Sequence, residues 1–229
     1  MNKDAGATLT AVIGVVLVRL AVEGTFRRYV RSGMGPWLLL AGVLLILLGI
    51  VVLWRHRHGD DDHSAHEHGG EQVAWLLLAP VLVLLVIAPG ALGSFSLGRT
   101  GSAVTVRSGG GVYTALDPNG EPREMSLLEF DQRAFEGTDG ASFNGATVRL
   151  VGFVAPADGD GFLVARYSIA CCAADALAAT AHVVGWSGPV PDRDTWVEVE
   201  GRFERGGADN PRLTAVSVTP IPEPDDPYE

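Results

Sequence analysis

The stretch Thr195–Glu204, with the sequence TWVEVEGRFE, decides the fold of the C-terminal half of this chain. Its apolar residues alternate with polar ones, as expected of a strand with one buried face. Gly201 follows in the pattern apolar-x-apolar-x-Gly, which Ala146–Val154 (ATVRLVGFV) repeats at Gly152. A glycine inside a strand often marks a bend or bulge where a small barrel turns a corner. The two strands therefore predict a curved sheet.

Three further segments extend this pattern: Gly161–Ala170, Thr180–Gly185 and Leu213–Ile221. Five strands separated by glycine and proline predict a β-rich domain of residues 112–229 that folds as an OB-like small barrel. Ser126-Leu-Leu-Glu129 has the spacing of a capping box and predicts one short helix over about 127–136. Since OB folds host many functions, the fold by itself assigns none.

The N-terminal part, residues 1–92, has a different character because it contains three long apolar runs. The runs are Ala7–Phe26, Pro36–Trp54 and Gln72–Leu92, with 20, 19 and 21 residues. As helices they would each span about 28–32 Å, which matches a bilayer hydrocarbon core of roughly 30 Å. We expect three transmembrane helices in the lipid bilayer, hence a multi-pass protein of the cell membrane. A flexible tether of residues 93–111 would lead to the barrel.

Two charged residues, Arg19 and Glu23, fall inside the first run. Their i, i+4 spacing puts them on one helix face, where they could pair, extend to the membrane surface or contact a partner membrane protein. Near the helix ends, five Lys and Arg residues fall on one side of the membrane and three on the other. This difference favours a cytoplasmic C-terminal domain.

The loop 55–71, between the second and third runs, is rich in histidine and aspartate. It contains five of the six histidines of the chain: His56, His58, His63, His66 and His68. They could bind zinc, copper or nickel loosely, because neutral imidazole is a common ligand of these metals. The alternative is a solvated linker that is charged to stay out of the membrane.

The chain has only two cysteines, Cys171 and Cys172, and they are adjacent. Neighbouring Cα atoms lie about 3.8 Å apart, less than the roughly 4.4–6.8 Å of a relaxed disulfide, so a bridge between them would be strained. Asp175 follows in an expected helical turn, Ala173–Ala178, and His182 lies on the next strand. These two cysteines, the aspartate and the histidine could together hold zinc or copper.

Other interpretations of this region stay open. The thiols could form a redox pair, or they could pack as small buried side chains. Asp175 could cap the turn that follows it, and Arg166 could pair with Asp175 or Glu198. His182 could be an ordinary strand histidine.

Charge and motifs argue against two function classes. The net charge of −10 comes without a basic patch for phosphate, so we expect no nucleic-acid partner. The sequence shows no Ser/His/Asp set, no phosphate-binding loop and no paired acid–base carboxylates in a recognisable context. We therefore do not expect an enzyme.

Three segments are distinctive: Arg166–Asp175 (RYSIACCAAD), Trp196–Gly201 (WVEVEG) and Pro224–Tyr228 (PDDPY). Together with the order of apolar runs, histidine-rich loop and β-rich domain, they resemble the YcgQ-like family. These are uncharacterised bacterial membrane proteins described as permease subunits. The resemblance implies that related proteins have Cys or His at the position that matches Cys171 and Cys at the next position. It also implies that they have an Ala-Asp pair at the positions that match Ala174 and Asp175. A metal ligand would allow that exchange of Cys for His.

The resemblance also implies a partner, a multi-spanning permease. We expect an accessory membrane subunit of this permease that binds or handles a transition metal. The alternative is a structural adaptor that docks on the permease without ligand chemistry, and a third hypothesis is a thiol redox module.

Overall fold

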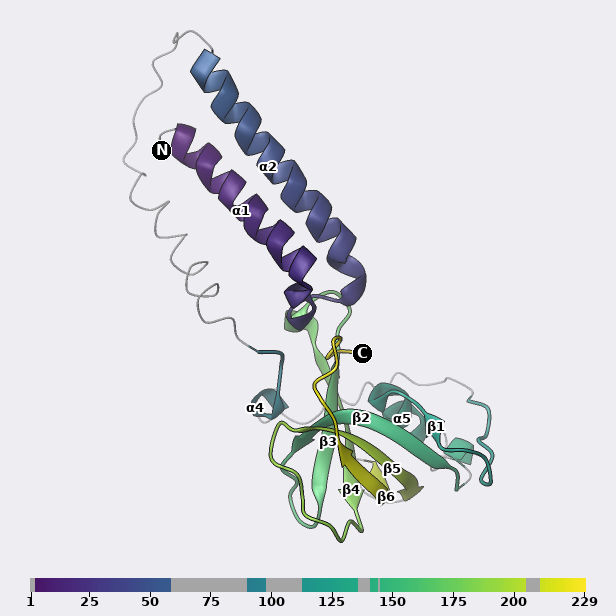
Figure 1. Ribbon diagram of the computed structural model, residues 1–229. Helices are drawn as coiled ribbons and strands as arrows, with labels where there is room; N and C mark the ends of the chain where they lie inside the picture. Colours follow the sequence, from purple (N-terminus) through teal and green to yellow (C-terminus); the bar gives the residue numbers. More distant parts are fainter. Residues whose placement is uncertain (1–2, 59–89, 98–112, 136–140, 144, 205–210) are drawn as a thin grey trace. The chain divides into compact units, whose positions relative to one another are not determined.

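The computed structural model describes residues 3–58, 90–97, 113–135, 141–143, 145–204 and 211–229 (Figure 1). The chain divides into two compact units, Met1–Gly90 and Ala91–Glu229. The second unit contains the barrel, and it begins well before residue 112, where the sequence pattern places the start of the β-rich domain.

The first unit contains two long helices, α1 (Lys3–Glu23) and α2 (Gly35–His58), which run antiparallel (Figure 1). Both are long and apolar enough to cross a membrane. Their outer surfaces expose large apolar side chains, and Trp37 and Trp54 lie near the ends of α2. The third expected helix, Gln72–Leu92, lies outside the described residues except for its last three positions.

Small residues let α1 and α2 approach closely. A Cβ atom on Gly14 would lie 2.7 Å from the carbonyl oxygen of Gly42. One on Gly49 would lie 2.8 Å from the carbonyl oxygen of Ala7. A larger side chain at any of these glycines would force the helices apart.

The helix α1 ends at Glu23, earlier than the apolar run suggests. Gly24 has a φ of 75°, the left-handed conformation that commonly follows a helix. The chain then continues through the 3-10 turns η1 (Thr25–Arg28) and η2 (Ser32–Met34). Arg19 Nε donates to Glu23 Oε1 at 2.8 Å, so the two charged residues of the first run pair with each other.

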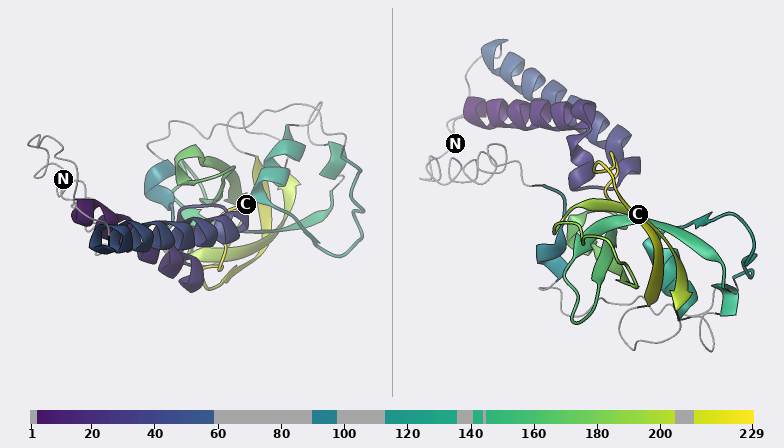
Figure 2. Two further views of the ribbon diagram at one scale, coloured as in Figure 1. Left: turned by 90° about the horizontal axis from the view of Figure 1, so that it is seen from above. Right: turned by 60° about the horizontal axis from the view of Figure 1, so that its bottom comes forward.

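Five strands of the second unit form a closed barrel in the order β2-β3-β4-β6-β5, and β5 pairs again with β2. They are β2 (Thr147–Ala155), β3 (Phe162–Ser168), β4 (Leu177–Val184), β5 (Trp196–Glu204) and β6 (Arg212–Pro220). Neighbouring strands are antiparallel except for β4 and β6, which are parallel. Both views of Figure 2 show the strands curling round, which confirms the expected OB-like barrel.

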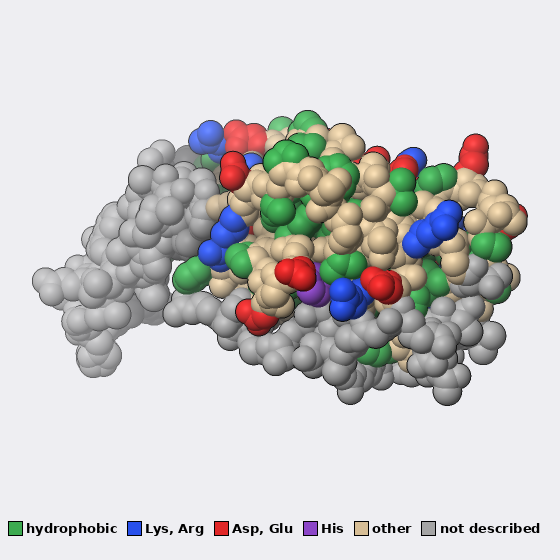
Figure 3. Space-filling model, turned by 90° about the horizontal axis from the view of Figure 1, so that it is seen from below, with side chains coloured by type: hydrophobic (Ala, Val, Ile, Leu, Met, Phe, Trp, Pro, Cys, Tyr) green, Lys and Arg blue, Asp and Glu red, His purple; other side chains and the backbone are tan. Residues whose placement is uncertain are grey.

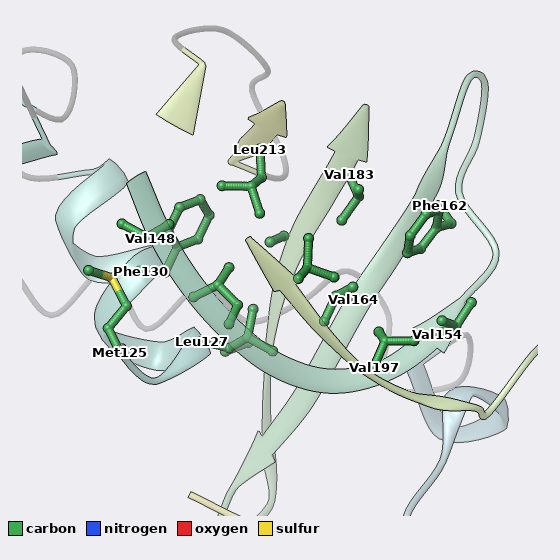
Figure 4. Close-up of a cluster of buried hydrophobic side chains, with 14 of the residues drawn as sticks. Met125, Leu127, Phe130, Val148, Val154, Phe162, Val164, Val183, Val197 and Leu213 are labelled. Carbon is green, nitrogen blue, oxygen red and sulfur yellow. The ribbon is translucent and has the colours of Figure 1, made fainter. Parts of the chain in front are cut away.

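Short elements precede the barrel: β1 (Arg123–Glu124), which pairs with β2, the helix α5 (Leu127–Ala134) and the 3-10 turn η3 (Ala141–Phe143). Ser126 Oγ accepts the amide of Glu129 at 2.9 Å, which confirms the N-cap. Leu127 and Phe130 point from α5 into the barrel, as Figure 4 shows. We call the buried residues there the interior cluster: Met125, Leu127, Phe130, Phe143, Val148, Leu150, Val154, Phe162, Val164, Ala179, Ala181, Val183, Val197, Val199 and Leu213.

The two strand glycines have the local roles that the pattern predicts. A Cβ on Gly152 would lie 2.6 Å from the carbonyl oxygen of Ala165, so β2 and β3 approach closely here. The pairing of β5 with β6 shifts register between Glu200 and Gly201, as in a β-bulge.

The start of β4 differs from the prediction. The expected helical turn Ala173–Ala178 is only the 3-10 turn η4 (Ala173–Asp175), and β4 begins at Leu177 rather than at Thr180. The reason is pairing, since Leu177 lies opposite Ser168 in the ladder with β3. Helix propensity of an alanine-rich stretch is a weak preference, and strand pairing overrides it here.

A second group of buried side chains, the outer cluster, lies on the outer surface of the barrel. Residues of β2, β3 and β5 in this cluster alternate along the chain with residues of the interior cluster, so they face outward. Its buried members are Phe153, Ala165, Tyr167, Ile169, Ala178, Trp196 and Tyr228. Partly buried residues from both ends of the unit, Ala91, Leu92, Leu97 and Ile221, pack against them.

The segment Ala91–Leu97 is therefore part of the barrel domain, whereas the sequence pattern places residues 91–92 in the third apolar run and residues 93–97 in a flexible tether. It includes the short helix α4 (Ser94–Leu97). The amide of Ser94 donates to Asp194 Oδ1 at 2.7 Å, and the amide of Leu92 donates to Tyr228 Oη at 3.2 Å. Residues 98–111 of the expected tether lie outside the described residues.

Candidate metal centre

Two cysteines and an aspartate meet in the turn between β3 and β4. The possible ligand atoms of Cys171, Cys172 and Asp175 all lie within 4.8 Å of one another. The two sulfur atoms are 3.7 Å apart, and both thiols are free. Cys171 is exposed, while Cys172 and Asp175 are half-buried, so solvent reaches this cluster.

The backbone of the turn holds the Asp175 carboxylate in place. Asp175 Oδ1 accepts the amide of Ala170 at 2.9 Å. Asp175 Oδ2 accepts the amides of Cys171 and Cys172 at 2.9 and 3.3 Å. The carboxylate thus bonds back to the residues before it, and the expectation that it caps the following turn is wrong.

Contact between Asp175 and Cys171 changes the acidity of both groups. A hydrogen bond from the Cys171 thiol, supported by the backbone amides, lowers the pKa of Asp175. The pKa of the Cys171 thiol is raised to about 11. The largest cause is this same hydrogen bond with Asp175, and a hydrogen bond with Cys172 is the second. At neutral pH the carboxylate is therefore ionised and the Cys171 thiol keeps its proton.

His182 lies apart from this cluster. It pairs with Leu163 in the β3–β4 ladder, five positions along β4 from Leu177, where the strand leaves the turn. At roughly 3.3 Å per residue the separation along the strand is about 16 Å. His182 Nε2 lies 2.7 Å from the carbonyl oxygen of Asp160, so the histidine has a local backbone partner. The structure thus brings together three of the four predicted ligands.

The histidine-rich loop is mostly outside the described residues. His63, His66 and His68 lie in the range 59–89, which the structure does not describe. His56 and His58 belong to the last turn of α2, but their side chains are also outside the described part. Loose metal binding by this loop stays a prediction.

Arg166 has partners that the sequence did not indicate. Instead of Asp175 or Glu198, it contacts main-chain carbonyl oxygens of the C-terminal tail. Its Nη2 donates to the carbonyl oxygen of Asp226 at 2.8 Å. The tail is the segment after β6, residues 221–229, and its three prolines indicate an extended segment but not where it docks.

The tail also changes what the barrel surface can bind. OB folds commonly bind oligonucleotides or oligosaccharides on the face of their second and third strands, which correspond to β3 and β4 here. The outer cluster covers part of this face with the chain's own segments. On the side of the molecule shown in Figure 3, acidic and basic side chains are interspersed among the described residues.

Fold and site together define a class of protein, an OB-like barrel with a Cys-Cys-Asp turn on a chain that also has long apolar helices. Residues 137–229 match the family model described as the DUF1980 C-terminal domain. This match covers the barrel strands and the cysteine turn, and it is consistent with the resemblance to the YcgQ-like family. No curated protein and no solved structure matches the chain.

Proposed function

We propose that this protein is a membrane-attached module that binds a transition metal ion, zinc or copper, at Cys171, Cys172 and Asp175. The supporting observation is the spacing of the two sulfur atoms, 3.7 Å. Two thiolates of a tetrahedral zinc ion, each with a Zn–S distance of about 2.3 Å, lie about 3.8 Å apart. The turn thus holds the sulfurs at the separation that a shared metal ion needs.

The donor set favours metal exchange over permanent structural binding. Thiolates are soft ligands that select zinc and copper, and the Asp175 carboxylate would be the third protein ligand. Structural zinc sites normally have four protein ligands, whereas three ligands leave a position open. Among the described residues, no fourth metal-binding side chain joins the group, and Cys171 is exposed. A metal here would be accessible to an incoming ligand.

The hydrogen bond between Cys171 and Asp175 makes metal binding depend on pH. A metal ligates the thiolate, so binding must release the proton that Cys171 shares with the carboxylate. Affinity should therefore increase as pH rises. The raised pKa of Cys171 also disfavours the redox alternative, because a protonated thiol is a poor nucleophile at neutral pH.

Cobalt(II) titration of the full-length chain in detergent tests the proposal. Thiolate coordination of Co2+ gives a charge-transfer absorption, and the chain has only two cysteines, so the histidine-rich loop cannot produce this signal. We expect saturable absorption in the wild type, competition by Zn2+, and loss of the signal in Cys172→Ser. Asp175→Asn should weaken binding without abolishing the absorption.

His182→Ala is the matched control, because this histidine lies far along β4 and should leave the titration unchanged. Absence of thiolate absorption in the folded wild type would refute the proposed metal site. In that case the structural adaptor, in which the cysteines bind no ligand, becomes the better hypothesis.

The resemblance supplies the partner in this proposal, a multi-spanning permease, and the apolar helices supply the means of association in the membrane. Co-expression of the chain with such a permease should yield co-elution in mild detergent, and deletion of residues 1–58 should abolish it. We further propose a cytoplasmic barrel. A reporter that works only in the cytoplasm should be active when it is fused after residue 229. A reporter that works only after export should be inactive at the same position.

A further inference from the structure

The main chain of Glu229 is bonded to the strand that leads into the cysteine turn. The Glu229 amide donates to the carbonyl oxygen of Tyr167 at 2.9 Å, and the amide of Ile169 donates to the Glu229 carbonyl oxygen at 3.2 Å. Ser168 Oγ donates to that same carbonyl oxygen at 3.1 Å. Tail and strand run parallel here. Glu229 therefore holds the chain up to two residues before Cys171.

The side chain of Glu229 reaches a different element. Its two carboxylate oxygens accept the amides of Leu127 and Leu128, at 2.9 and 3.0 Å. These amides lie in the first turn of α5, where backbone donors have no partner within the helix. The Glu229 side chain is only 9% exposed, and Arg166 Nη1 lies 3.9 Å from it. The carboxylate thus ties the tail to the start of α5.

The helix α5 is in turn fixed by the interior cluster, since Leu127 and Phe130 are fully buried there. Contacts among the described residues therefore run without a break from the interior cluster through α5 and Glu229 to Ile169. On the other side of the turn, Leu177 is held by its pairing with Ser168. Both ends of the turn are therefore anchored, one by the β3–β4 ladder and the other by Glu229.

We propose that Glu229 is a positioning residue for the metal site, which holds Cys171 at its distance from Cys172 and Asp175. This inference rests on the proposed function. Groups that orient metal ligands from outside the coordination sphere typically change metal affinity by 10- to 100-fold when mutated. Glu229 acts through the backbone and should fall at the lower end of that range.

The test compares three variants of the full-length chain in detergent by Co2+ titration. Glu229→Ala removes both hydrogen bonds to α5 and should weaken Co2+ binding roughly tenfold. Its absorption per bound Co2+ should also fall, because a displaced sulfur leaves the metal. Glu229→Gln keeps the shape and one acceptor oxygen, so it should recover most of the affinity.

Val199→Ala is the control for stability alone. Val199 is fully buried in the interior cluster and is not part of the outer cluster, which includes Tyr228 of the tail. Val199→Ala should therefore lower stability and leave the Co2+ affinity of the folded protein unchanged. If Glu229→Ala binds Co2+ like the wild type, the positioning role is wrong while the metal site stands. If the wild type shows no thiolate absorption, the proposed function itself fails. Should Glu229→Ala not fold, Leu128→Pro takes its place, because it removes one of the two amides that donate to Glu229. Co2+ binding by Leu128→Pro with the wild-type affinity would then refute the positioning role.

Discussion

The interior cluster and the outer cluster use similar side chains but are assembled differently. The interior cluster comes from alternating residues of neighbouring strands and from α5, and most of its members are fully buried. The outer cluster joins segments that are distant in the chain, as in the hydrogen bond between Leu92 and Tyr228, 136 positions apart. The first therefore sets the stability of the barrel, while the second places the tail and with it the cysteine turn. The two contributions should be separable by mutation.

The largest effect is expected in the interior cluster. Leu150 is fully buried, and Leu150→Ala should lower the free energy of unfolding by about 2–5 kcal/mol, because it loses apolar contacts and leaves a cavity. Denaturant unfolding of the chain in detergent measures this loss. The Co2+ affinity of the folded fraction should not change, and a large change in affinity would show that the two clusters are not independent.

Arg166→Ala should have a smaller effect on stability but a clear effect on the tail. The variant loses charge-assisted hydrogen bonds to the tail carbonyls, and such bonds contribute about 1.5–3 kcal/mol. Hydrogen exchange at the Ile169 and Glu229 amides should accelerate, since both are bonded between tail and strand. Arg149→Ala is the matched control, because this half-exposed arginine pairs with Glu200 on the barrel surface, and its loss should cost less stability than the loss of Arg166. Unchanged exchange in Arg166→Ala would contradict the role of Arg166.

Tyr228→Phe removes a single acceptor from the outer cluster. The ring stays buried, but the amide of Leu92 loses its partner, which should cost about 1 kcal/mol. In this variant, hydrogen exchange of the Leu92 amide should be faster, while the amides of β5 should exchange as in the wild type. This result would show that the effect is confined to the contact of Leu92. Faster exchange throughout β5 would instead mean that this hydroxyl supports the whole barrel.

The mildest test is the pH dependence of stability. Burial raises the pKa of Glu229, although the Leu127 and Leu128 amides and Arg166 counteract it. Between the ordinary pKa and the raised one, the folded state binds a proton that the unfolded state has lost. Stability should therefore fall as pH rises through this window. The free energy of unfolding of Glu229→Gln should fall less over this window than that of the wild type. Identical pH profiles of the free energy of unfolding for the wild type and Glu229→Gln would contradict the prediction.

The barrel could be predicted because its information is local. Alternation in Thr195–Glu204, the glycine at the bulge and the Ser126 cap each act within a few residues of the chain. The grouping of Cys171, Cys172 and Asp175 was also predictable, since it needs only one turn of backbone.

The remaining features depend on pairing between distant segments. His182 looked like a ligand because it follows the cysteines closely in sequence, but the length of β4 carries it away from the turn. Glu229 and Arg166 gave no sign of their partners, because a tail that adds to a barrel edge has no periodic pattern of its own.

The docked segment Ala91–Leu97 has a practical consequence for producing the barrel by itself. A fragment cut at residue 112, where the composition changes, would lack Ala91, Leu92 and Leu97, and it would expose apolar surface around Phe153 and Trp196. Exposed patches of this kind promote aggregation. A fragment that begins at Ala91 should be the more soluble of the two, although it carries more of the apolar sequence.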